Sequence, residues 1–134
     1  MRRALPGLLL AAVSAAGCGH HEFEPPDREA KIEAAAASYT PALFDTVAWD
    51  GEDQRGAVGN QLFLEHCRSC HGPLGQGGTD YALERGLDVP SLTGPDWARA
   101  HPVSLRRVIF VGHPSGMPVF GDRRLTPREV DALT

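Results

Sequence analysis

The chain has 134 residues, enough for one small domain, and its apolar fraction of 42% is that of an ordinary globular protein. Eleven prolines and fifteen glycines predict long irregular connections, which a bound group would have to organise. The formal net charge of −4 is unevenly distributed, because residues 22–53 carry nine acids against two basic residues and residues 55–134 carry nine arginines against eight acids. Because residues 55–134 are nearly neutral in charge, the composition argues against nucleic acid as a partner.

The first seventeen residues have the pattern of a signal peptide. Met1–Arg3 is basic, residues 4–16 are small and apolar, and this run is too short to span a bilayer. The small residues before Cys18 are similar to a bacterial lipobox, which predicts a lipid on Cys18 and a protein anchored at the periplasmic side of a bacterial membrane. Ala15 stands where that motif usually has a branched aliphatic residue. The alternative is therefore cleavage after Ala16 and a soluble periplasmic product.

Residues 18–54 are interpreted as a lipid-anchored acidic tether or arm. Residues 27–38 predict a helix with Asp27 as its N-cap. The segment after it carries too many large apolar side chains for a linker, namely Leu43, Phe44, Val47 and Trp49. They pack either on the chain's own domain or on a partner, and burial on the chain's own domain is the commoner outcome.

The domain proper is expected over residues 55–134 and in the all-α class. A first helix is predicted over 56–70 by apolar residues at helical spacings, which are Val58, Leu62, Phe63, Cys67 and Cys70. Residues 72–100 are rich in Gly, Pro and Asp and predict a loop with one helical turn near 81–85. Leu105, Val108 and Ile109 predict a second helix that ends at Gly112. Thr126–Glu129 has the capping box that opens a third.

One motif carries the chemistry of the sequence. Cys67-Arg68-Ser69-Cys70-His71 is the pattern in which two thiols form thioethers with a haem and the histidine ligates its iron. A redox dithiol would follow a strand, and a zinc site would need a second ligand pair, which is missing. A lipid on Cys18 and two thioethers would use all three cysteines. The expected cofactor is one covalent haem c.

The sixth ligand of the iron is predicted to be Met117. It is the only methionine besides the initiator, and it lies in a loop between Gly116 and Pro118, which restrict the backbone and leave the thioether projecting. The rival ligands are three histidines, His66, His101 and His113. His66 precedes the attachment motif and is expected to point away from the ring, whereas His113 is near enough to Met117 in sequence to compete with it.

Residues 56–134 resemble a class I c-type cytochrome of the small, bacterial, single-haem kind. The features that match in order are Gly59 with Phe63, the CRSCH motif, the segment Pro90–Gly94, the segment Gly116–Pro118 and the start of the last helix at Thr126. The resemblance implies three to four helices wrapped around the haem. It also implies that the Pro90 carbonyl accepts the proton of His71, that Leu92 covers the ring, and that the last helix packs on Gly59 and Phe63.

The last helix would be one or two turns shorter than is usual in that family. We expect either that the natural chain continues past Thr134, which the strong capping box favours, or that a partner or residues 40–49 cover the exposed face.

With both axial positions filled, the expected protein is an electron carrier and not an enzyme. It would pass one electron between redox proteins of a periplasmic respiratory or photosynthetic chain, and no small-molecule substrate is expected. Two alternatives remain open. One is a haem-bearing docking subunit of a membrane redox complex, and the other is a haem sensor or peroxidase-like protein with a labile sixth ligand.

Overall fold

A computed structural model describes residues 27–95 and 102–134, and in these ranges the protein is helical and contains no strand. The predicted all-α class is therefore confirmed, while the residues of the predicted signal peptide, Cys18 and His101 lie outside the described residues. None of the described helices is long and apolar enough to cross a membrane. The elements are α1 (Arg28–Ser38), the 3-10 helix η1 (Pro41–Phe44), α2 (Glu52–His66), α3 (Arg68–His71), α4 (Asp80–Leu83), α6 (Pro102–Val111) and α7 (Pro127–Ala132).

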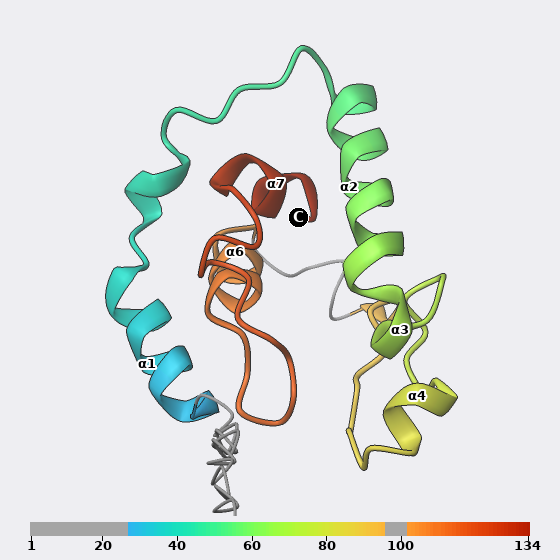
Figure 1. Cartoon of the computed structure of the whole chain (residues 1–134). Helices are drawn as coiled ribbons and strands as arrows, with labels where there is room; N and C mark the ends of the chain where they lie inside the picture. Colours follow the sequence, from blue (N-terminus) through green and yellow to red (C-terminus); the bar gives the residue numbers. More distant parts are fainter. Residues whose placement is uncertain (1–26, 96–101) are drawn as a thin grey trace, which may run out of the picture.

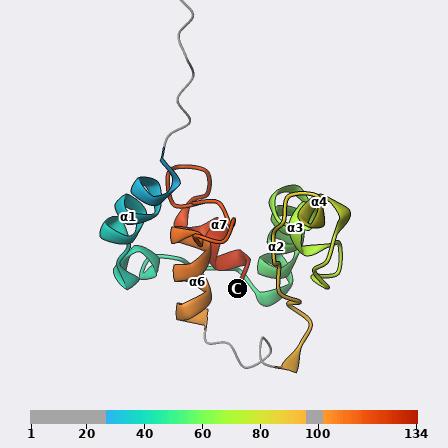
Figure 2. The ribbon, with the colours of Figure 1, turned by 90° about the horizontal axis from the view of Figure 1, so that it is seen from below.

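Helices α6 and α7 occupy the middle of the molecule. Helix α1 lies on one side of them and α2, α3 and α4 lie on the other, in both views (Figures 1 and 2). The segment between η1 and α2 arches from the first side to the second, so α7 has η1 on one flank and α2 on the other (Figure 1). The chain thus surrounds its own C-terminal helix.

The predicted helix termini are present where the sequence has capping residues. Asp27 accepts a hydrogen bond from the backbone N–H of Glu29 at 2.9 Å at the start of α1. Thr126 and Glu129 form a reciprocal capping box at the start of α7. Helix α6 ends before Gly112, whose φ of 77° suits glycine.

The helix predicted over residues 56–70 is in fact two helices. Helix α2 begins four residues earlier, at Glu52, and ends at His66, while α3 begins at Arg68. Cys67 between them has φ −113° and ψ −35°, which departs from helical geometry in φ. Its carbonyl still accepts from the N–H of His71 at 2.9 Å, so the attachment motif forms a separate turn at the end of α2.

Helices α2 and α7 pack as closely as the resemblance implied. A Cβ on Gly59 would overlap the backbone carbonyl of Ala132, so only glycine permits this approach. Leu62 is buried in the same contact, whereas Phe63 is half-buried. The described part of the chain therefore has the close helix pair that the resemblance implied.

Residues 39–49 also take part in the core. Phe44 is 6% exposed and belongs to the main apolar cluster, whose other buried members are Leu62, Phe120, Leu125, Val130 and Ala132. Leu43, Val47 and Trp49 pack against that cluster. Of the two alternatives for these apolar side chains, the structure has them on the chain's own domain.

A buried carboxylate connects residues 39–49, which we call the N-terminal segment, to α7 and α6. Asp131 is 4% exposed; one of its oxygens accepts from Trp49 Nε1 at 2.7 Å and the other from Arg106 Nε at 2.8 Å. Arg55 of α2 lies 3.9 Å from the carboxylate. Because a buried charge needs such partners, Asp131 holds residues from four parts of the chain together.

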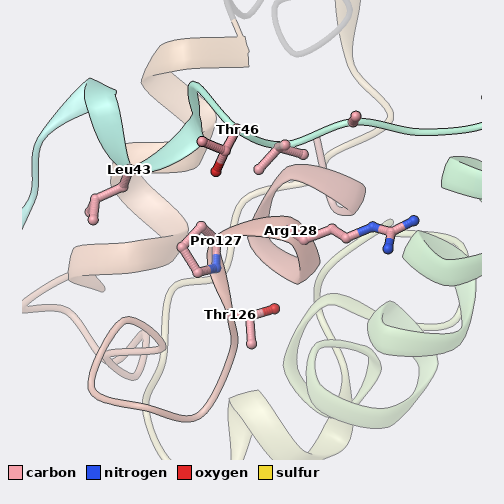
Figure 3. Close-up of a pocket in the computed structure, with 7 residues that line it drawn as sticks. Leu43, Thr46, Thr126, Pro127 and Arg128 are labelled. Atoms are coloured by element: carbon pink, nitrogen blue, oxygen red, sulfur yellow. The ribbon is translucent and has the colours of Figure 1, made fainter.

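A small cavity of about 300 Å³ lies between residues 43–48 and the start of α7. Figure 3 shows Leu43 and Thr46 on one wall and Thr126 and Pro127 on the other, with the side chain of Arg128 extending toward α2. The Arg128 guanidinium lies 4.3 Å from the centre of the Trp49 ring. This contact links Trp49 to α7.

Candidate functional site

A larger cavity of about 410 Å³ lies on the side of α3. It collects side chains from the end of α2, from α3, from residues 87–90, from α6 and from the loop after α6. The predicted residues Cys67, Cys70, His71, Pro90 and Met117 all line it, although 50 positions separate the first from the last. The fold therefore brings five of the predicted site residues into one cavity.

The two cysteines of the motif are free thiols and half-buried. Burial raises the pKa of the Cys67 thiol to about 11, and the neighbouring Cys70 adds to the rise. Redox dithiols work because their thiol pKa is lowered, so that a thiolate is available near neutral pH. Cys67 has the opposite environment, which does not suit a redox dithiol.

His71 points its Nδ1 atom into the interior. This atom is buried and has no hydrogen-bond partner in residues 27–95 and 102–134. Burial lowers the pKa of the ring, and the Pro90 carbonyl opposes that effect, although the two groups do not reach the geometry of a full hydrogen bond. Burial thus favours the neutral imidazole, which is the form in which histidine binds a metal.

The loop after α3 places Pro90 next to this ring. The N–H of Gly77 donates to the His71 carbonyl at 2.7 Å, and a Cβ on Gly77 would stand 2.6 Å from the Val89 carbonyl. Gly77 has φ 73°, so both its conformation and its contacts require glycine. Thr79, the last residue before α4, donates a hydrogen bond from Oγ1 to the Ser69 carbonyl at 2.6 Å.

The loop that carries Met117 is fixed to the end of α6. A Cβ on Gly112 would stand 2.8 Å from the Met117 carbonyl and 2.7 Å from the Pro118 carbonyl, so this glycine lets the loop fold back on the helix. The N–H of His113 donates to the Met117 carbonyl at 3.1 Å. Met117 is half-buried, lines the cavity and packs against the main apolar cluster.

Two expectations about neighbouring residues differ from what the structure has. Leu92 lies outside the cavity lining, because its N–H donates to the Gly75 carbonyl at 2.6 Å and its side chain lies against Gly75. Leu87 lines the cavity instead. His66 lines the cavity too, with its ring 6.2 Å from that of Phe120, and so does not point away as expected. His66 is the last residue of α2 and directly precedes the break at Cys67.

Sequence reasoning did not identify most of the apolar lining. Leu87, Val108 and Phe120 supply it, and Tyr81 lies at the cavity with Arg85 stacked 3.7 Å over its ring. The helical period of α6 could have pointed to Val108, which is 37% exposed. Leu87 and Phe120 lie in loops, where no period marks the direction of a side chain.

The residues of the cavity fit a haem. Two free thiols three positions apart, an imidazole from the next residue and a thioether from a distant loop meet in a largely apolar space, which polar side chains such as His66, Asp88 and His113 also border. These groups are the attachment and ligand set of a c-type haem. A metal ion alone would not need an apolar lining, whereas the porphyrin ring of a haem does.

The helical fold and this cavity define a c-type cytochrome domain of the small, class I kind. Residues 54–134 match the family described as cytochrome C oxidase, cbb3-type, subunit III, so the chain belongs to that family. No curated protein and no solved structure matches the chain significantly. Membership in a cytochrome c family implies haem binding and electron transfer.

Proposed function

We propose that the protein transfers single electrons through one haem, bonded covalently to Cys67 and Cys70 and ligated by His71 and Met117. The observation that carries this proposal is that all four side chains line one cavity, although they come from two distant parts of the chain. A haem bound there would supply reversible one-electron oxidation and reduction of its iron.

The residues of the chain set the conditions for that exchange. The thioether of Met117 is a soft ligand that favours ferrous iron, and the apolar lining disfavours the additional charge of ferric iron. Pro90 can accept the Nδ1 proton of His71 after a small shift, which would satisfy a buried atom that has no partner in the described ranges and fix the ring. With His71 and Met117 both bound to it, the iron would have no position left for a substrate.

The partner is proposed to be a membrane redox complex, with the protein as its haem-bearing subunit. The family match supports the role of a complex subunit over that of a separate carrier, because the family is described as a subunit of an oxidase. A lipid on Cys18 would hold the domain at the periplasmic surface, where such complexes exchange electrons. A carrier and a subunit need the same haem site, so the two readings share one chemistry.

A redox titration of the holoprotein, combined with exposure of the ferrous form to carbon monoxide, tests the proposal. One reversible one-electron transition and a ferrous spectrum unchanged by carbon monoxide are expected, because both axial positions are filled. Rapid binding of carbon monoxide by the native protein would instead favour a sensor or a peroxidase-like enzyme.

A further inference from the structure

Two possible iron ligands of the cavity lie in one tight turn. His113 and Met117 both line the cavity, the N–H of His113 donates to the Met117 carbonyl at 3.1 Å, and the N–H of Gly116 donates to the His113 carbonyl at 3.1 Å. Imidazole is a strong ligand for haem iron. Both side chains could therefore compete for the sixth position of the iron.

The His113 ring is exposed, and it makes two contacts with the equally exposed Ser115. Its Nδ1 atom accepts from the backbone N–H of Ser115 at 3.2 Å and lies 2.6 Å from Ser115 Oγ. A backbone N–H can only donate, so Nδ1 must present its lone pair. A neutral imidazole has one bare nitrogen, and the proton is therefore on Nε2.

We infer that Ser115 withholds His113 from the iron by fixing its imidazole as the Nε2–H form, and so assigns the sixth position to Met117. Coordination through Nε2 needs a lone pair on that atom, so the proton would have to move to Nδ1 and face the N–H of Ser115. Coordination through Nδ1 would displace both contacts with Ser115. Ser115 is thus a positioning residue that acts through His113, and the inference rests on the haem site proposed above.

The first test is the tautomer of His113 in the ferrous holoprotein, recorded by long-range proton–nitrogen correlation in the neutral state of the ring. The expected result is a proton on Nε2 and a bare Nδ1. A proton on Nδ1 would overturn the inference, whichever residue ligates the iron. This measurement needs no substitution and so does not depend on the stability of a variant.

The second test uses Met117→Ala, alone and combined with His113→Ala, both in the holoprotein. We expect the single variant to become high-spin and its ferrous form to bind carbon monoxide, with a spectrum that the added His113→Ala leaves unchanged. A low-spin spectrum in Met117→Ala that is lost in the double variant would mean that His113 reaches the iron, against the inference.

The same experiment separates this inference from the proposed function. Absence of covalent haem in the native protein would refute the function and with it the inference. Persistence in Met117→Ala of the weak near-infrared band of methionine-ligated ferric haem would refute the ligand assignment and therefore the inference. A high-spin single variant that His113→Ala leaves unchanged, together with the expected tautomer, supports both.

Discussion

At Gly59, the absence of a Cβ atom allows α2 and α7 to pack in close contact. Helix α7 crosses α2 so closely that a Cβ on Gly59 would overlap the Ala132 carbonyl, which is backbone and cannot turn aside. Gly56, one turn earlier on the same helix, has nothing within 4 Å of the place where its Cβ would be. The two glycines therefore form a matched pair.

Gly59→Ala is expected to destabilise the protein by about 1–3 kcal/mol, because the helices must separate to admit the methyl group. Gly56→Ala is expected to stabilise it by roughly 0.5–1 kcal/mol through helix propensity. Chemical denaturation of both holoproteins measures the difference. A loss of stability in Gly56→Ala as large as in Gly59→Ala would show that the contact with Ala132 is not the cause.

At this scale the sequence singled out four side chains that the structure brings to one cavity, but it did not single out most of their surroundings. Cys67, Cys70 and His71 form a contiguous motif, and Met117 is distinctive by its rarity and its neighbours. The role of Leu87 in place of Leu92 depends on how two loops pack, which no local pattern records. His66 was expected to face away because it precedes the attachment motif, and the helical period of the sequence gives no sign that α2 ends there.

The 3-10 helix η1 joins the domain at the scale of elements. Phe44 is buried at the core, and the guanidinium of Arg106 lies 5.0 Å from its ring centre. Phe44 lies outside the residues that match the family, which begin at position 54. The N-terminal segment therefore completes a core whose other buried members lie within the family domain.

Phe44→Ala should lower the free energy of unfolding by about 3–5 kcal/mol, the usual cost of removing a buried phenylalanine side chain. Leu74→Ala is the control, because Leu74 is 80% exposed and such a change is usually within about 0.5 kcal/mol. Denaturant midpoints of the two variants provide the comparison. Equal midpoints would mean that η1 contributes little to the stability of the domain.

The capping box of α7 predicts a pH dependence. Hydrogen bonds from the backbone and side chain of Thr126 lower the pKa of Glu129 below its ordinary value of 4.5. A lowered pKa stabilises the fold fully above the unfolded value and loses that contribution as the pH falls through the folded value. The stability difference between the native protein and Glu129→Ala should therefore be present at neutral pH and shrink in acid.

Denaturation of both proteins at a series of pH values measures this effect. Because the carboxylate is largely exposed, the difference is expected to be modest and sensitive to salt. A difference that stays constant into strong acid would mean that the charge of Glu129 plays no part in the cap.

Local signals explain which elements could be predicted. The caps at Asp27 and Thr126 depend on side chains within three residues, and the glycine that ends α6 acts on its own backbone, so the sequence located these termini. The packing of residues 39–49 could only be left as one of two alternatives. Apolar content indicates burial, but it does not specify the surface that covers it.

At the scale of the whole molecule, residues 39–49 are part of the core, and they also lie in sequence between the domain and the proposed lipid anchor at Cys18. Asp131 binds Trp49 and Arg106, so residues 39–49 are held to α6 and α7 by polar as well as apolar contacts. An anchor at Cys18 would then be separated from a structured domain only by the residues before α1. The proposed lipid and the proposed haem thus use different cysteines, Cys18 for the one and Cys67 with Cys70 for the other.

Cys18→Ser should release the protein from membranes into the soluble periplasmic fraction and leave its visible spectrum unchanged, because the lipid and the haem use different cysteines. Fractionation of cells with immunodetection of the protein provides the measurement. Retention of the variant in the membrane fraction would argue that a partner complex, and not a lipid, holds it there.

The most direct test of the central claim is a pyridine haemochrome spectrum of the denatured protein after extraction with acidified acetone. Two thioethers at Cys67 and Cys70 predict that the haem stays with the polypeptide and has the spectrum of haem c, at one haem per chain. Haem that is extracted into the solvent, or a protein expressed with haem-maturation factors that holds none, would contradict the account.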